Sequence, residues 1–238
     1  MAEYKRGFCV SCCVYGGMEP RTVWSVIKSF MSGLNFYFPM RPDDALIGRS
    51  RSIEASQFLK HNLAPFLVFL DADIAFEPWQ LEKLVEDMKQ GYELVGGLYV
   101  VKDGSQLAQY GLGEKGNFPC DNEIHEVKYI STGFFGVSRW LLEQVQEGLN
   151  LPLCHPGEWD ECYPFFESGL YIDPDIGPIY ISEDWDFCNK ARKVGAKVYA
   201  DTSIRVRHVN KKEFTVEELL EALTQEPSSL KINKEKVN

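Results

Sequence analysis

The chain lacks an excess of positive charge, a long apolar run and a secretory leader. Its 238 residues carry a formal net charge of -10, so bulk electrostatics does not attract it to nucleic acid or to an anionic membrane, and we expect no nucleic-acid partner. No apolar run approaches the ~20 residues that a membrane-spanning helix requires, which predicts no transmembrane segment. Met1 to Gly7 is short and polar, unlike a signal peptide, so the expected location is cytoplasmic.

The chain also lacks the cysteine pattern of a disulfide framework and the glycine pattern of a dinucleotide or P-loop site. It has seven cysteines, an odd number, which favours reduced thiols. Cys9 and Cys12 form a C-x-x-C match inside an apolar strand pattern, without a second pair at zinc spacing, so core packing is the preferred interpretation. Gly16-Gly17 alone makes neither a G-x-G-x-x-G fingerprint nor a P-loop.

Apolar runs and helical patterns alternate along the chain, which predicts an α/β fold with a central, mostly parallel sheet flanked by helices and a smaller antiparallel part. The main domain is expected over 1–210, followed by a C-terminal helix and charged tail over 211–238. Residues 102–126 predict a hairpin and 148–180 a long irregular loop. The expected strands are 7–14, 66–70, 94–101, 127–130, 134–137, 197–200 and 204–209, and the expected helices are 20–31, 49–61, 79–88, 140–146, 183–194 and 216–223.

Two aspartates follow the most apolar predicted strand. Phe66 to Leu70 is continuously apolar and leads into Asp71-Ala72-Asp73, and ligands of parallel sheets bind beyond the carboxyl ends of the strands. Residues i and i+2 of an extended segment point the same way, so we expect two carboxylates without a cation of their own to bind a divalent metal. The alternative is that both aspartates serve as turn or helix-cap residues.

Three further segments carry candidate site residues. A predicted helix begins with three acidic residues, Glu183, Asp184 and Asp186. Either one of them is a general base, or they are favourable charges at the helix N-terminus. His208 follows two strand arginines and is either a metal ligand beside the aspartates or a packed residue. Arg49 and Arg51 stand at a helix start, where they either bind phosphate or are solvated.

The order of these motifs resembles the GT-A fold glycosyltransferases, especially the family 2 type. Asp71-Ala72-Asp73 resembles their metal-binding D-x-D, preceded by Arg49-Ser50-Arg51 and followed by the Gly96-Gly97 strand. The remaining matches are Ser131-Thr132-Gly133, then Glu183-Asp184, and finally His208, and the series covers about residues 8–210. The resemblance implies a single GT-A (nucleotide-diphospho-sugar transferase) domain.

The resemblance also implies an activity: transfer of a sugar from a nucleotide diphosphate, most often a UDP- or GDP-sugar, to a hydroxyl of a glycan or other acceptor. It implies an inverting reaction with Asp184 as the base and Glu183 as the alternate, and Mn²⁺ or Mg²⁺ as the cofactor. It assigns the metal to Asp71, Asp73 and His208. Donor contacts are implied at Tyr15, Arg49, Arg51, Asp71, Ala72, Asp73 and Gly133, with the aromatic loop 159–171 shaping the pockets.

Two other classes of protein stay open at this point. A haloacid-dehalogenase-like phosphatase also places D-x-D after a buried strand, with the first aspartate as nucleophile, although its motif usually opens the chain. A non-catalytic protein that binds a nucleotide sugar or a glycan could use the same fold, since fold does not determine function.

Overall fold

The computed structural model describes residues 4–102, 104–108, 119–174, 177–210 and 213–224. The helices are α1 (Pro20–Met31), α2 (Ile47–His61), α3 (Pro78–Lys89), α4 (Arg139–Gly148), α5 (Glu183–Lys193) and α6 (Val216–Thr224). The strands are β1 (Phe8–Val14), β2 (Phe36–Tyr37), β3 (Met40–Pro42), β4 (Phe66–Asp71), β5 (Ile74–Ala75), β6 (Leu94–Leu98), β7 (Ile124–Glu126), β8 (Phe134–Ser138), β9 (Gly169–Asp173), β10 (Gly177–Ile181), β11 (Tyr199–Arg205), β12 (Arg207–Val209) and β13 (Glu213–Phe214).

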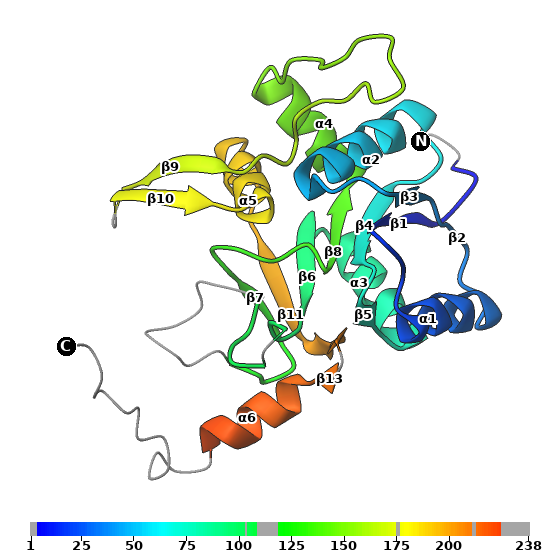
Figure 1. Ribbon diagram of the computed structural model, residues 1–238, viewed down its shortest axis with the longest axis vertical. Helices are drawn as coiled ribbons and strands as arrows, with labels where there is room; N and C mark the ends of the chain where they lie inside the picture. Colours follow the sequence, from blue (N-terminus) through cyan, green and yellow to red (C-terminus); the bar gives the residue numbers. More distant parts are fainter. Residues whose placement is uncertain (1–3, 103, 109–118, 175–176, 211–212, 225–238) are drawn as a thin grey trace.

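One large sheet forms the centre of a single domain (Figure 1). Its order is β2-β1-β4-β8-β6-β11-β7, with β3 also paired to β1. Strand β8 is antiparallel to both β4 and β6, and β7 is antiparallel to β11, while the other pairs are parallel. Two small antiparallel sheets, β9-β10 and β13-β12-β5, complete the fold. The predicted α/β class, with a mostly parallel central sheet and a smaller antiparallel part, is confirmed.

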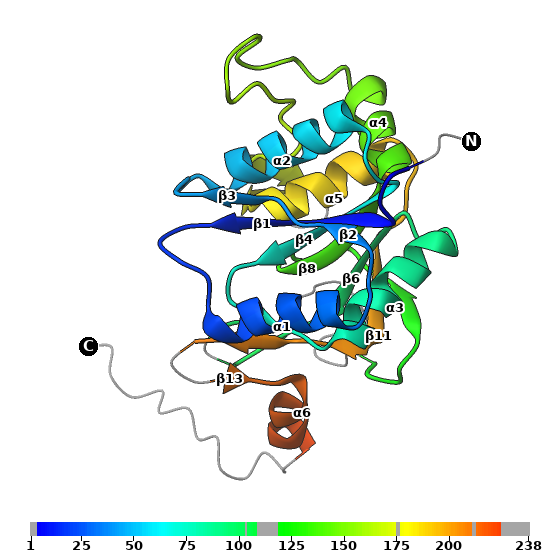
Figure 2. The same ribbon diagram turned by 90° about the vertical axis from the view of Figure 1, so that its right-hand side faces the viewer.

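Helices cover both faces of the sheet, as Figure 2 shows. Side chains of α2, α4 and α5 form one apolar cluster with one face of the sheet, and side chains of α1 and α3 form a second cluster with the other. Because β4 lies between these layers, its apolar residues from Leu67 to Leu70 are all buried. This arrangement explains the continuous apolar run, and it leaves Asp71 at the strand's end as the first polar side chain.

The sequence located most elements correctly, but it did not predict the short strands β2, β3, β5 and β13, and three segments differ from the expectation. The expected strands 197–200 and 204–209 are not separated as predicted, because β11 runs continuously across the gap between them and β12 follows it. Strand β11 pairs with β6 and has a register shift between Asp201 and Arg205. Residues 127–130 form no strand: the strand there is β7, and the apolar side chains that follow it enter the core. The segment 148–180, expected to be irregular, contains the β9–β10 hairpin. Part of the hairpin expected over 102–126 lies outside the described residues.

The C-terminal helix α6 belongs to the same core as the sheet. Val216 and Leu219 are buried in the cluster that contains α2, α4 and α5. None of the described helices combines the length and the apolar character needed to cross a membrane.

Candidate active site

Arg51 connects the end of β4 with the start of α5. Its Nη2 lies 2.5 Å from Oδ1 of Asp71, and its Nη1 donates a hydrogen bond to Oε1 of Glu183. The guanidinium comes from the second turn of α2, and its side chain is only 5% exposed. One buried arginine therefore joins three segments that the sequence marked separately: the arginine pair, the D-x-D motif and the acidic helix start.

The charges in this cluster control one another. Burial alone lowers the pKa of Arg51, but Asp71 and Glu183 outweigh this effect and the pKa is raised. Burial raises the pKa of Glu183, an effect that Arg51 opposes and Asp184 reinforces. Arg51 therefore stays protonated, and its positive charge offsets the cost of keeping the two partly buried carboxylates ionised.

Asp73 has cationic neighbours of its own. Lys102 Nζ lies 2.7 Å from Oδ2 of Asp73, and Nε2 of His208 lies 3.5 Å from the same oxygen. Burial alone raises the pKa of Asp73, but His208 and Lys102 outweigh it and the pKa is lowered. The expectation that the two aspartates have no cation of their own is therefore wrong, because Arg51 accompanies Asp71 and Lys102 accompanies Asp73.

A small sheet brings His208 to Asp73 across 135 positions of the chain. Strand β12 pairs with β5, with His208 opposite Ile74, and the backbone N–H of Val209 donates to the carbonyl of Asp73 over 2.7 Å. On the ring itself, Nδ1 lies 2.8 Å from the carbonyl of Val100. A carbonyl only accepts hydrogen bonds, so Nδ1 carries the hydrogen and Nε2 faces the carboxylate.

The Asp73–His208 pair fits a divalent metal. In neutral His208, the Nε2 lone pair faces the carboxylate, and two acceptors at this distance require a cation or a proton between them. Donation from the other ring nitrogen to a carbonyl is the usual support of a metal-ligating histidine. Within the part of the chain that the structure describes, no group of three His, Cys, Asp or Glu side chains is close enough to enclose an ion. Any metal here would need ligands from a substrate or from water, as is usual for Mg²⁺.

Gly133 lies against Asp71, and no side chain fits at its position. The backbone N–H of Asp71 donates to the Gly133 carbonyl over 3.0 Å, and the Gly133 N–H donates to the Tyr99 hydroxyl over 2.9 Å. A Cβ at Gly133 would lie 2.6 Å from the Tyr99 hydroxyl oxygen and 3.2 Å from Oδ2 of Asp71. The glycine therefore lets β8 approach the aspartate closely.

The three acids at the start of α5 have three different surroundings. Glu183 binds Arg51, and Asp186 lies 2.7 Å from Nζ of Lys190. Asp184 instead accepts hydrogen bonds from the Ser182 hydroxyl and, over 2.8 Å, from the Trp185 backbone N–H. Among the described residues, Asp184 forms no ion pair. Of the three, it is the carboxylate that no cation neutralises.

The remaining expected donor contacts are spread around this cluster. Ala72 accepts a hydrogen bond on its carbonyl from the backbone N–H of Glu19 over 2.8 Å, which ties the loop before α1 to the D-x-D turn. Tyr15 is 71% exposed on the same loop. Arg49 binds Asp44 through Nε at 3.0 Å and Nη2 at 2.8 Å, and so it does not join the aspartates as Arg51 does.

The aromatic loop 159–171 divides into core and surface residues. Phe165 and Phe166 are buried, and Phe166 stacks on Phe187 with ring centroids 4.6 Å apart. These two rings therefore belong to the core and are not available to shape a pocket. Trp159 is exposed, and the guanidinium of Arg41 lies 5.0 Å from its ring centroid.

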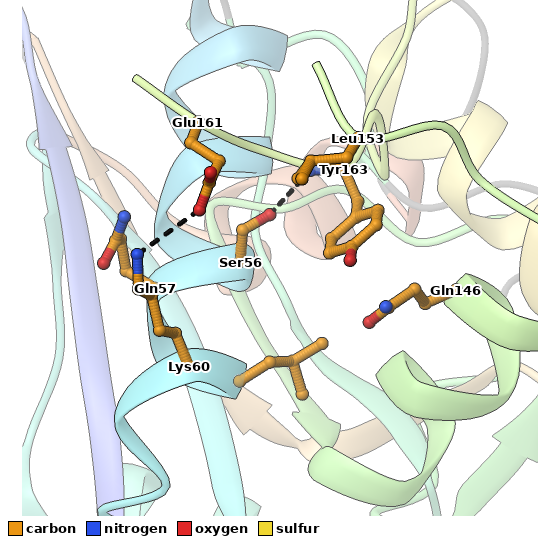
Figure 3. Close-up of a pocket in the computed structure, with 8 residues that line it drawn as sticks. Ser56, Gln57, Lys60, Gln146, Leu153, Glu161 and Tyr163 are labelled. Carbon is orange, nitrogen blue, oxygen red and sulfur yellow. Dashed lines mark hydrogen bonds and ion pairs between the residues drawn. The ribbon is translucent and has the colours of Figure 1, made fainter. Parts of the chain in front are cut away.

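A cavity of about 320 Å³ lies between α2, α4 and the segment that precedes Tyr163 (Figure 3). Its lining residues are Ser56, Gln57, Leu59, Lys60, Gln146, Leu153, Glu161 and Tyr163. Lys60 and Glu161 form an ion pair of 3.3 Å at its edge. Glu161 and Tyr163 of the loop expected to shape the pockets line this cavity, but none of the predicted catalytic, metal-binding or donor-contact residues does, so it is separate from the Asp71–Asp73 cluster.

Sequence reasoning missed Lys102 and Tyr99, which both follow from the position of β6. Strand β6 is parallel to β11, and the residues after its carboxyl end lie at the edge of the sheet where ligands bind. The strand was predicted over 94–101, but β6 ends at Leu98, so Tyr99 and Lys102 lie beyond its carboxyl end. Tyr99 is buried, which raises the pKa of its hydroxyl.

Comparison with known proteins supports the fold and leaves the activity open. No known family profile matches the chain, and no curated protein sequence matches it either. Among solved structures, the crystal structure of A197 from STIV is similar, with a TM-score of 0.57 and 18% sequence identity. The match covers 88% of this chain and 93% of that one. At this identity the similarity establishes a shared fold over nearly the whole domain.

Proposed function

We propose that this protein is a glycosyltransferase of the GT-A type, which transfers a sugar from a nucleotide diphosphate to an acceptor hydroxyl. The single observation that carries the proposal is the cluster in which Arg51 holds Asp71 and Glu183 together while Asp184 stays free of any cation among the described residues. In this cluster Arg51 neutralises part of the negative charge of Asp71 and Glu183, which lets an anionic donor approach. Asp184 keeps its negative charge for proton transfer.

Asp184 is the proposed general base. Its Oδ1 is oriented by the Ser182 hydroxyl and the Trp185 backbone N–H, which leaves Oδ2 to accept a proton from an acceptor hydroxyl. Glu183 is the poorer base because it shares its charge with Arg51. A base that activates the acceptor directly gives an inverting displacement at the anomeric carbon.

Asp73 and His208 are the proposed metal ligands, with Mn²⁺ or Mg²⁺ completing its shell on the donor's diphosphate. When bound, such an ion supplies positive charge that stabilises the departing nucleoside diphosphate. The protein's own contribution is to hold Asp71 and Asp73 in fixed positions through Arg51, Gly133 and Lys102. Tyr15 and the loop beside it are proposed to contact the base of a UDP- or GDP-sugar.

The structure disfavours a phosphatase in which Asp71 is the nucleophile. Oδ1 of Asp71 lies 2.5 Å from Nη2 of Arg51, a buried guanidinium. A carboxylate paired with a buried cation is a weaker nucleophile, because the cation stabilises its negative charge.

The proposal is tested by incubating the protein with UDP-, GDP- and TDP-sugars in the presence of Mn²⁺ and following release of the nucleoside diphosphate. We expect one donor to turn over, with the product anomer inverted by NMR. Asp184→Asn should then lose turnover about 10²–10⁴-fold while still binding that donor in calorimetry. Donor binding without turnover on any acceptor indicates a binding protein instead, and phosphate release from simple phosphomonoesters indicates a phosphatase.

A further inference from the structure

Helix α1 presents its large apolar side chains to the outside of the molecule. Its buried positions are Thr22, Ser25, Val26 and Ser29. Its exposed large residues define what we call the α1 apolar face: Val23, Trp24, Ile27, Phe30 and Met31. An amphipathic surface helix normally turns its apolar stripe to the core, so the orientation of α1 is reversed.

Hydrogen bonds on the inner side fix this orientation. The Ser25 hydroxyl accepts a hydrogen bond from the buried backbone N–H of Phe76 over 2.9 Å and donates to the carbonyl of Arg21 over 3.0 Å. The Ser29 hydroxyl donates to the carbonyl of Ser25 over 2.9 Å. A rotation that buried Trp24 would leave the Phe76 N–H without an acceptor, and a buried unsatisfied donor costs about 1–3 kcal/mol. The outward apolar face is therefore a stable feature of the fold.

The α1 apolar face continues onto the edge of the central sheet. Phe30 stacks on Phe36 with ring centroids 4.1 Å apart, and β2, which contains Phe36, is an edge strand. Exposed Met40 on β3 is in register with Cys12 of β1 and Leu70 of β4, which places it on the α1 side of the sheet. Figures 1 and 2 show α1 at the periphery, and no described element covers its outer side.

The size of this surface matches half of a protein–protein interface. With full areas of about 150–250 Å² for large side chains, the exposed fractions of the α1 apolar face correspond to roughly 500 Å², and Met40 enlarges it further. The largest apolar patch on a monomer is typically about 300–600 Å². A standard interface buries about 800 Å² on each partner, so these apolar side chains supply more than half of the area and a polar rim supplies the rest.

The charge of the molecule decides between possible occupants. A net charge of -10 opposes approach to an anionic lipid surface. The α1 apolar face itself carries no ionisable side chain, and the adjacent Lys28 is compensated by Glu77 at 2.5 Å. A two-fold interface places the same patch against itself, so a patch whose centre carries no charge of one sign suits it. The exposed Arg21 lies one turn before Trp24.

We propose that the α1 apolar face, with Met40, binds the same surface of a second copy of this chain to form a two-fold dimer. Trp24 lies at the centre of the helix and is 53% exposed, which is the type and position of a residue that dominates an interface. The interface also borders the D-x-D turn, since the Glu19 N–H that precedes α1 is bonded to the carbonyl of Ala72.

The test is sedimentation velocity of the full chain from low micromolar to several hundred micromolar concentration. We expect a concentration-dependent dimer. Trp24→Glu and Ile27→Glu should each raise its dissociation constant at least about thirtyfold, with unchanged circular dichroism because both side chains are exposed. The matched control is Trp140→Glu on α4, a tryptophan that is 51% exposed on the other side of the sheet; the dimer should persist in this variant.

Three results overturn the proposal. One is a monomer at every concentration. Another is a dimer that the two α1 variants leave intact. The third is a monomer that co-sediments with neutral phosphatidylcholine vesicles and loses that binding in Trp24→Glu, which assigns the surface to lipid.

Discussion

Nη2 of Arg51, in α2, lies 2.5 Å from Oδ1 of Asp71, the last residue of β4. The same guanidinium binds Glu183, so removing it leaves two carboxylates uncompensated. We expect Arg51→Met to lower the free energy of unfolding by about 3–5 kcal/mol, as for other buried pairs that lose one partner. Urea unfolding at pH 7 measures the loss.

Arg49→Met is the matched control for this measurement. Arg49 stands two positions away and also binds an aspartate, but its side chain is exposed, so its loss should cost less than about 1 kcal/mol. Equal effects of the two substitutions would show that the connection between β4 and α5 does not stabilise the fold.

Lys102 and His208 meet the same oxygen of Asp73 and should have opposite effects on Mn²⁺ binding. His208→Ala removes a proposed ligand and should weaken binding more than tenfold. Lys102→Met removes an ammonium group that competes for the carboxylate and should strengthen binding. Calorimetry with Mn²⁺ alone measures both affinities without requiring turnover, and Lys89→Met on the exposed side of α3 serves as the control. Weaker binding in Lys102→Met would contradict the competition.

Gly133→Ala should destabilise the protein and displace Asp71. The added methyl group would lie 2.6 Å from the Tyr99 hydroxyl, and overpacking of this kind costs about 1–3 kcal/mol. Gly169→Ala is the control, because a Cβ there meets nothing within 4 Å. Thermal unfolding compares the two variants, and an equal melting temperature for Gly133→Ala and the unmodified protein would contradict the close approach.

Asp87 should make stability fall as the pH rises. Burial raises the pKa of this carboxyl to about 7 against the opposing effect of Lys83, and Asp201 raises it further. Between about pH 4 and 7 the folded chain therefore keeps a proton that the unfolded chain releases, so this group's contribution is complete below about pH 4 and lost as the pH passes 7. Its buried Oδ2 has no hydrogen-bond partner, so no donor at that oxygen stabilises the charged form.

Asp87→Asn supplies the neutral side chain at every pH. Relative to the unmodified protein, we expect it to gain on the order of 2 kcal/mol in unfolding free energy between pH 5 and pH 8. Urea unfolding at the two pH values measures the difference, with Glu86→Gln on the exposed side of α3 as the control. A difference that does not change with pH would show that Asp87 is ionised in the folded protein throughout.

Local signals determined the elements and their order. Helix α1 has the predicted bounds because Pro20 suits the first turn of a helix and Gly33, with φ at +89°, ends it. The apolar run into Asp71 identified the buried strand and the polar residue at its end. The motifs around the D-x-D were recognisable because each is a short segment whose type depends on its own residues.

Tertiary structure alone decided which of these residues meet and which faces are buried. Arg51 and Glu183 are 132 positions apart, and only the packing of α2 and α5 on the same face of the sheet brings them together. The spacing of Val23, Ile27 and Phe30 places them on one face of α1 but does not give the direction of that face, which is set by the buried N–H of Phe76 that takes Ser25 as its acceptor. Periodicity records which side chains share a face, whereas the partners of buried polar groups decide where that face points.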